Sequence, residues 1–419
     1  MLSVFTNAWK VQDIRKRLMY IIMVLGIYRI GCQIPLPGIN AELLLEAKTG
    51  ITQNLFSIIS GGEYGTIFAM GIGPYITASI IMQLLTVAIP TLEQLKKEGE
   101  EGRKKINQIT RYLAVGLAAV QGAGTVFTLR TLFVYQNMFV YIMAVLAIVT
   151  GTIFIMWLGE LVTERGIGNG ASFIIFANIL SGFPATVMNM YNLAVGGNWT
   201  EWAKLGAVVL IFIAVIAFVV LIQNGERRLP VQHSKKMVGR QMFGGQSSFI
   251  PLKVNIAGVM SIIFAISLLQ MPTMLGQFWE ESIRPEWITT AMHYLDITHP
   301  LGASLYVILI FFFTFFYTSF AMNAVEMAEN MKKSGGFIPG IRPGKPTSEY
   351  IQRTIDRLSW IGALFYSVLA LMPVLLEWTF GFQVGFGGTT LLIVVGVCLE
   401  LVKQLESKML MRHYKGFLS

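Results

Sequence analysis

The sequence has few charged residues and few side chains of the kinds that carry out chemistry. Only 13% of its 419 residues are Asp, Glu, Lys or Arg, and its two cysteines are too few for a disulfide framework. Its four histidines lie in loops and tails outside the apolar runs, and the common signatures of hydrolases, nucleotide-binding loops and Cys-x-x-Cys redox sites are absent. These absences argue against an ordinary soluble protein and give no support to an enzyme.

Apolar residues make up 54% of the sequence, and the mean hydropathy is +0.62. A run of about 18 or more apolar residues is long enough to cross a bilayer as a helix. The sequence therefore predicts an all-α integral membrane protein. The candidate spans are 18–34, 72–90, 112–129, 139–159, 171–190, 205–222, 254–272, 303–322, 358–376 and 387–402.

Positive charge is unequally divided between alternate connections. Most of the 32 Lys and Arg residues fall in every second connection, on the side that holds the amino terminus. The exceptions are Arg29, Lys48, Arg130, Lys204 and Arg284. Because cytoplasmic loops are enriched in Lys and Arg, this bias predicts ten spans with both termini in the cytoplasm.

Ten spans divide into two halves of five, and an odd number in each half makes the halves inverted relative to one another. We expect an N-terminal half over residues 1–190, an outer hinge loop over 191–204 and a C-terminal half over 205–419.

An apolar segment at 54–65 is too short to cross the bilayer. Such a segment is either a re-entrant helix that lines a pore or a helix that lies on the outer membrane surface.

Two predicted cytoplasmic segments, 223–253 and 323–357, are too long for simple connections. The first mixes basic and apolar residues in near-alternation, which predicts a projecting hairpin. The second is rich in Gly and Pro, which fix turns and so hold Arg342 on a defined loop. Taken singly, each basic residue there is also explained as a solvated positive-inside charge.

Isoleucine is the residue that could close a pore without ionisable groups. Ile72 and Ile76 are spaced i, i+4 on one helix face beside Gly73-Pro74. An isoleucine pair in a membrane helix faces lipid or a neighbouring helix more often than a channel. A secondary transporter normally places acidic or histidine side chains near mid-membrane, and Glu160, Glu326, Glu377 and Glu400 instead lie at or near span ends.

Six segments resemble consecutive signature segments of the SecY family, in family order. They are RIGCQIPLPGIN (29–40), GIGPYITASIIMQLLTVAIPTLEQLKKEGEEGRKKINQITRY (71–112), WLGELVTERGIGNGASFIIFANI (157–179), PLKVNIAGVMSIIFA (251–265), KKSGGFIPGIRPGKPTSEYI (332–351) and FGGTTLLIVVGV (386–397). The resemblance covers essentially the whole chain.

The resemblance implies an hourglass channel closed by a ring of apolar side chains, with a plug and a lateral gate between the second and seventh spans. The implied ring is Ile72, Ile76, Ala171, Ile175, Ile263 and Ile393, and the small Ala171 stands where the family often has isoleucine. The implied plug residues are Leu55, Phe56, Ile58, Ile59, Gly61 and Gly62. The implied polar contacts of the gate are Thr77, Gln83 and Asn255. The two long cytoplasmic segments are the predicted docking surface for a motor or ribosome, with Lys235, Arg240, Arg342 and Lys345 as the docking residues.

The function implied by the resemblance is a passive protein-conducting pore in the bacterial cytoplasmic membrane, without a cofactor. Its implied partners are the small membrane subunits SecE and SecG, the motor ATPase SecA, the ribosome, and preproteins with signal sequences. A secondary transporter of a small solute and a membrane-embedded enzyme remain alternatives.

Overall fold

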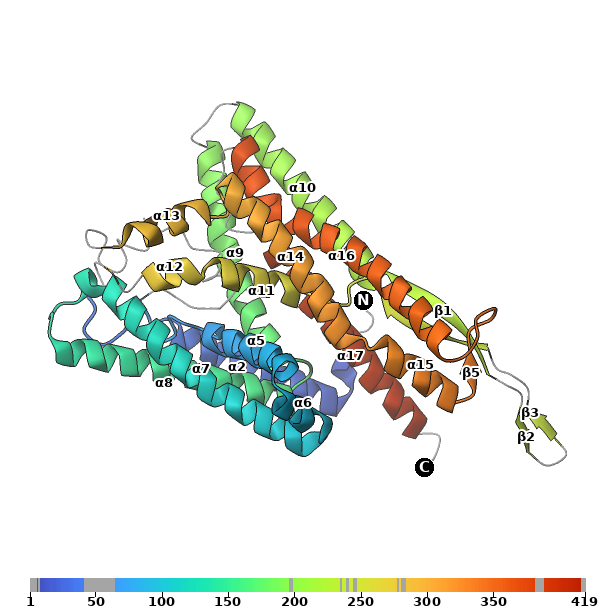
Figure 1. Cartoon of the computed structure of the whole chain (residues 1–419). Coiled ribbons are helices and arrows are strands. Elements are labelled where there is room, and N and C mark those ends of the chain that lie inside the picture. The colour runs from blue at the N-terminus through green and yellow to red at the C-terminus, as the bar shows by residue number, and fades with distance from the viewer. Residues whose placement is uncertain are drawn as a thin grey trace. The chain divides into compact units, whose positions relative to one another are not determined.

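The computed structural model describes residues 6, 8–40, 65–195, 199–233, 236–238, 241–243, 247–276, 279, 284–380 and 388–415. These residues are mostly helical, with a few short strands (Figure 1). The helices are α2 (Gln12–Gly31), α5 (Gly73–Ala88), α6 (Pro90–Lys97), α7 (Glu100–Thr128), η1 (Arg130–Leu132), α8 (Met138–Arg165), α9 (Gly170–Val195), α10 (Trp199–Asn224), α11 (Met260–Leu269), α12 (Met271–Gly276), α13 (Glu286–Tyr294), α14 (Pro300–Ala321), α15 (Ala324–Lys333), α16 (Lys345–Phe380) and α17 (Gly388–Lys415).

A helix lies within each of the ten predicted spans. Five helices in the described part of the chain are long and apolar enough to cross a membrane, and the bent pair of α5 and α6 would make a sixth. The prediction of an all-helical, multi-pass membrane protein is confirmed. The count of ten spans stays a prediction.

The bend between α5 and α6 is 101° and has a local cause. Pro90 opens α6, and the residue before a proline is pushed out of the helical region. Ile89 accordingly has extended backbone angles, φ −109° and ψ 114°. The membrane segment that starts at Gly73 thus ends before the polar, charged α6.

The predicted seventh span, 254–272, is helical over a shorter stretch than expected. α11 has 10 residues, which corresponds to about 15 Å of helix. Gly258 before it has φ +62°, and Pro272, just after it, cannot donate a backbone hydrogen bond. The sequence prediction counted apolar residues and took no account of these two backbone breaks, so it made the helix too long.

The helices group into two compact units. The first comprises Met1–Asn192, Gln270–Tyr294 and Gly396–Ser419, and the second comprises Leu193–Leu269 and Leu295–Val395. The predicted hinge loop 191–204 overlaps the end of α9, which runs to Val195, and the start of α10 at Trp199, and its role as a hinge stays a prediction. Hydrophobic runs mark only the part of a helix in hydrocarbon, and helices continue into the interface. The two inverted halves stay a prediction.

In the first unit, α7 packs on α5 and on α8, and α2 also packs on α8. Small residues allow close approach: a methyl group on Gly122 of α7 would lie 3.1 Å from Ile148 Cγ2 of α8, and one on Gly151 of α8 would overlap the carbonyl oxygen of Ile67, in the segment before α5. Small residues at helix interfaces are the usual means by which membrane helices pack closely.

In the second unit, α14 packs on α11 and on α16. The segment after α10 forms a long hairpin, in which β1 (Glu226–His233) pairs antiparallel with β4 (Ser247–Lys253). β2 (Lys236–Val238) and β3 (Gln241–Phe243) form a second antiparallel pair at its far end (Figure 1). The predicted hairpin over 223–253 is confirmed.

The second long loop joins the first through a third strand. β5 (Gly336–Phe337) pairs antiparallel with β1, opposite Gln232 and His233. Side chains from the hairpin, α15, the β5 loop and the start of α16 share one apolar core. Its buried members are Leu229, Val231, Leu252, Ala324, Ala328, Met331, Ile338, Ile351, Ile355 and Leu358. We call this folded unit, residues 226–253 and 324–358, the hairpin module.

Candidate functional site

The loop that carries Arg342 lies at the edge of the hairpin module. Its backbone turns at Gly340, with φ +81°, and at Gly344, with φ +106°. Residues with a Cβ rarely adopt such angles, so these turns need glycine. Between them, the Ile341 amide donates to the Ile338 carbonyl at 3.1 Å, and Ile338 is buried in the core.

A second set of contacts closes the loop on the carboxyl side of Arg342. The Thr347 hydroxyl, on a residue only 1% exposed, donates to the Arg342 carbonyl at 2.8 Å. The Thr347 amide donates to the Gly344 carbonyl at 3.0 Å. Arg342 itself is exposed. The loop therefore fixes the backbone of Arg342 and leaves its guanidinium in solvent, as its Gly and Pro content predicted.

The exposed surface of the hairpin module is rich in cations. The described ones besides Arg342 are Arg227, Lys253, Lys332, Lys333, Lys345, Arg353 and Arg357. Arg228 is engaged within the module, because it pairs with Glu226 at 2.7 Å and lies 4.8 Å from the centroid of the Phe249 ring. Of the four predicted docking residues, Arg342 and Lys345 lie on one loop and its adjoining helix. Lys235 and Arg240 lie outside the described residues.

Four of the six predicted ring residues belong to the first unit. Ile72 precedes α5 and is 1% exposed, Ile175 on α9 is buried, and Ile76 and Ala171 are half-buried. Ile72 and Ala171 meet at a glycine of α8: a methyl group on Gly159 would lie 3.6 Å from Ile72 Cδ1 and 3.6 Å from the Ala171 amide nitrogen. The first unit thus brings two predicted ring residues, one just before α5 and one on α9, to one place.

Next to this place, the first residue of α9 lies close against α8. A methyl group on Gly170 would overlap the carbonyl oxygen of Gly159 and lie 2.9 Å from Val162 Cβ. The Gly170 amide donates to the Thr163 hydroxyl at 2.9 Å. The remaining two ring residues, Ile263 and Ile393, are buried in the second unit. Since the six residues divide between two units, the complete ring stays a prediction.

The three predicted gate residues make the following described hydrogen bonds. Thr77 donates to the Gly73 carbonyl at 3.1 Å and Gln83 to the Ser79 hydroxyl at 3.4 Å, both within α5. Asn255, in the second unit, accepts a hydrogen bond at Oδ1 from the hydroxyl of Tyr366 on α16. No feature of the sequence pointed to Tyr366, because one tyrosine in an apolar helix resembles any other. The facing of Gln83 and Asn255 stays a prediction.

The predicted plug residues Leu55, Phe56, Ile58, Ile59, Gly61 and Gly62 lie outside the described residues. The last residue of the predicted plug segment, Gly65, is described, with φ +74°, and its carbonyl accepts from the Leu36 amide at 3.0 Å.

Among the described residues no group of three or more His, Cys, Asp or Glu side chains could hold a metal ion.

The chain matches known proteins along nearly its whole length. A family model described as SecY matches residues 66–402. Two relatives carry the name protein translocase subunit SecY. The one from Streptomyces galbus is 44% identical over 442 aligned residues that cover 100% of both proteins, and the one from Escherichia coli K12 is 42% identical over 417, covering 97% of this chain and 94% of the relative. Neither name is that of an enzyme or a solute transporter.

Solved structures agree on the fold. A structure titled as a protein conducting channel has a TM-score of 0.63 at 20% identity and covers 93% of this chain and 91% of that one. Sec61 in the canine ribosome–channel complex has a TM-score of 0.60 at 19% identity with the same coverage. The match to the family over most of the chain, with relatives above 40% identity over their full length, shows that the chain belongs to the SecY family.

Proposed function

We propose that this chain is the channel subunit of a bacterial protein translocase, a passive conduit for proteins that cross or enter the cytoplasmic membrane with both its termini in the cytoplasm. The observation that carries the proposal is the 42–44% identity, over nearly the full length of both proteins, to relatives named protein translocase subunit SecY. No observation favours the solute transporter.

A conduit wide enough for an extended peptide has to block ions when it is empty. An apolar constriction does this by losing its water, and branched aliphatic side chains also yield by rotamer change when a peptide passes. Ile72, Ile76, Ala171, Ile175, Ile263 and Ile393 are the residues proposed for this ring. Ile72 Cδ1 and the Ala171 amide nitrogen both lie 3.6 Å from the position that a Cβ on Gly159 would occupy, which supports their grouping.

A lateral exit to lipid requires a seam that opens reversibly. Hydrogen bonds between membrane helices contribute about 1–2 kcal/mol in model peptides, enough to hold such a seam without locking it. Thr77 and Gln83 on α5 and Asn255 just before α11 are proposed to border it. The hydrogen bond from Tyr366 to Asn255 adds α16 to the elements that position its second side.

Transport through a passive conduit needs an energy source, and partner proteins would supply it. The small membrane subunits SecE and SecG would complete the complex, and SecA or the ribosome would drive secretory and membrane preproteins through it. The hairpin module is the proposed docking surface, because it presents exposed cations on a folded core with Arg342 on a restricted loop. An anchored guanidinium loses less conformational entropy when it meets a carboxylate or phosphate.

The test is transport by the complete complex. The purified chain, assembled with its small membrane subunits in liposomes and supplied with SecA and ATP, should carry a secretory precursor into the lumen, measured by protease protection. Arg342→Glu should abolish this transport and leave complex assembly intact, and Arg342→Lys should rescue part of it. Lys253→Glu is the matched control, since it reverses an exposed charge on β4 and should reduce transport only modestly.

Two outcomes would overturn the proposal at different levels. If Arg342→Glu transports the precursor at the wild-type rate, Arg342 has no docking role and is an ordinary positive-inside charge. Solute uptake driven by an ion gradient, in liposomes that carry no precursor at all, would instead support the transporter.

A further inference from the structure

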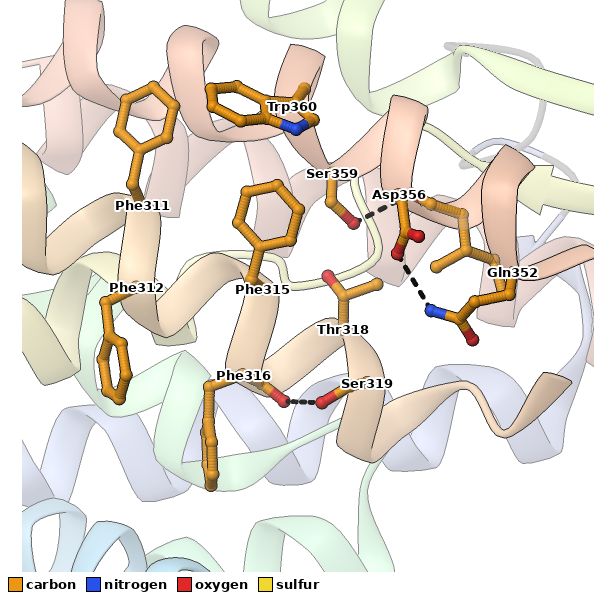
Figure 2. A pocket seen from close by; sticks show the side chains of 11 residues that line it. Phe311, Phe312, Phe315, Phe316, Thr318, Ser319, Gln352, Asp356, Ser359 and Trp360 are labelled. Carbon is orange, nitrogen blue, oxygen red and sulfur yellow. Dashed lines mark hydrogen bonds between the residues drawn. The ribbon is translucent and has the colours of Figure 1, made fainter. Parts of the chain in front are cut away.

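α14 and α16 border a groove in the second unit that none of the predicted roles uses (Figure 2). Its volume is about 590 Å³, within the range of small-molecule sites and well below what a whole partner domain requires. Six residues of α14 and five of α16 line it, and both helices belong to the same unit. The lining side chains are Phe311, Phe312, Phe315, Phe316, Thr318, Ser319, Gln352, Ile355, Asp356, Ser359 and Trp360.

One end of the groove is aromatic. The Trp360 ring packs edge-on against Phe311 and Phe315, with centroids 5.5 Å and 5.4 Å apart, and Phe312 stacks on Phe316 at 6.3 Å. Trp360 and Phe312 remain 61% and 60% exposed, so the walls of the groove are apolar and open outward. In a membrane protein such a surface faces lipid chains.

The other end of the groove is polar. The Asp356 carboxylate accepts a hydrogen bond from Gln352 Nε2 at 2.9 Å, and Figure 2 shows Thr318 pointing from α14 toward Ser359 and Asp356 of α16. Thr318 is 2% exposed, and within the described part of the chain its hydroxyl has no hydrogen-bond partner. One turn earlier, Thr314 shows the usual arrangement, in which the hydroxyl donates to the Ile310 carbonyl at 2.6 Å. Thr318 is therefore a buried polar group aimed into the groove, and such groups normally have a partner.

The order of polar and aromatic residues matches the depth of one membrane leaflet. The predicted apolar run of α16 begins at residue 358, so Gln352 and Asp356 precede it and Trp360 lies within it. From Thr318 back to Phe311 the groove follows about 10 Å of helix, which is most of the roughly 15 Å half-thickness of a hydrocarbon core. A ligand that fills it is polar at the interface and apolar toward the membrane centre.

We propose that this groove binds one phospholipid with a primary ammonium headgroup, from the leaflet that faces the hairpin module. The ammonium group donates to the Asp356 carboxylate, which has more acceptor positions than the single bond from Gln352 occupies. The Thr318 hydroxyl donates to an oxygen of the phosphate or of an ester, and an acyl chain lies along Phe311, Phe315 and Trp360. An anionic lipid without an amine would place its charge beside a carboxylate and is disfavoured.

The experiment uses the full-length chain in the complex it forms with its small membrane subunits, purified in detergent. Native mass spectrometry measures the binding of added dioleoyl phosphatidylethanolamine, phosphatidylcholine and phosphatidylglycerol. We expect the phosphatidylethanolamine Kd of the tightest site to be lowest, because the trimethylated headgroup cannot donate a hydrogen bond. Asp356→Asn should raise that Kd roughly tenfold, the loss expected of one charge-assisted hydrogen bond.

Matched variants separate this site from general effects. Glu349→Gln removes an exposed carboxylate of α16 that does not line the groove, and Thr314→Val removes a buried hydroxyl whose bond is already made within α14. Both should bind phosphatidylethanolamine as the wild type does, whereas Thr318→Val should weaken it severalfold. Ser319→Trp, at the exposed rim, should block the groove with Asp356 intact and serves if Asp356→Asn fails to assemble.

The proposal is overturned if Asp356→Asn and Ser319→Trp both bind phosphatidylethanolamine with wild-type affinity. It is also overturned if phosphatidylglycerol binds the wild type as tightly. Unchanged lipid binding together with loss of a small membrane subunit from Asp356→Asn would assign the groove to a protein helix and contradict a lipid.

Discussion

The proposed docking role of Arg342 depends on a rigid loop, and Gly344→Ala perturbs that rigidity alone. Gly344 has φ +106°, and no atom lies within 4 Å of the position that a Cβ would occupy. The substitution therefore adds no clash and removes no charge. Its only effect in the folded loop is backbone strain.

The magnitude follows from that strain. Left-handed backbone angles cost a residue with a Cβ about 1–2 kcal/mol. The observed loop conformation would then fall in population by a factor of about 5–30 relative to relaxed alternatives. If docking needs this conformation, the apparent Kd for the motor rises by up to the same factor, the full factor applying where the conformation becomes the minor one. The bond from Thr347 to the Arg342 carbonyl limits relaxation and places the effect toward the lower end.

The assay is the Kd of SecA for the complex in nanodiscs, measured for Gly344→Ala, Arg342→Ala and the double variant. We expect the double variant to bind SecA about as weakly as Arg342→Ala does. Once the guanidinium is removed, the conformation of the loop no longer affects the affinity. Gly116→Ala on α7 is the control, since its added methyl group also meets open space but its backbone is helical.

Wild-type affinity for Gly344→Ala, alongside weak binding by Arg342→Ala, would refute rigid presentation and leave charge as the whole explanation. Independent, additive effects of the two changes would also refute it.

The remaining predictions concern the ring and the gate. Replacing Ile76 and Ile175 by Ser should raise the single-channel conductance of the complex in planar bilayers, and unchanged conductance in a normally folded complex would remove them from the seal. A disulfide between Gln83→Cys and Asn255→Cys should stop precursor transport, with recovery on reduction, and transport that continues with the crosslink complete would place the exit elsewhere. Tyr366→Phe removes a hydrogen bond worth about 1 kcal/mol and should ease gate opening, measured as higher transport of precursors with weakened signal sequences; reduced transport would contradict a restraining role.

The helical part of the fold was largely predictable, because hydrophobic runs and the positive-inside bias are properties of single segments. A helix occurs within each of the ten predicted spans, and alternation of basic and apolar residues correctly indicated the hairpin. Helix ends were less predictable. α8 continues to Arg165 and α7 starts at Glu100, beyond their apolar runs, since helical hydrogen bonding does not stop where hydrocarbon does.

Contacts between distant segments could not be read from the sequence. β5 has two residues and no strand pattern of its own, so nothing local predicted its pairing with β1. The bond between Tyr366 and Asn255 joins positions 111 residues apart. The family resemblance identified Asn255 as a gate residue, but only the fold shows that the Tyr366 side chain donates a hydrogen bond to it.

α16 connects the proposed docking loop around Arg342 with the proposed gate residue Asn255. Its first turn follows the Arg342 loop, with Thr347 bonded to the Arg342 carbonyl, and about 30 Å further along the same helix Tyr366 bonds to Asn255. The helix is continuous between them, because its internal proline, Pro373, comes after Tyr366. Near its start the helix is buried against the hairpin module through Ile351 and Ile355. Coupling between two sites needs an element that contacts both of them. Within one unit of the chain, the proposed docking loop and the proposed gate residue Asn255 are both bonded to α16.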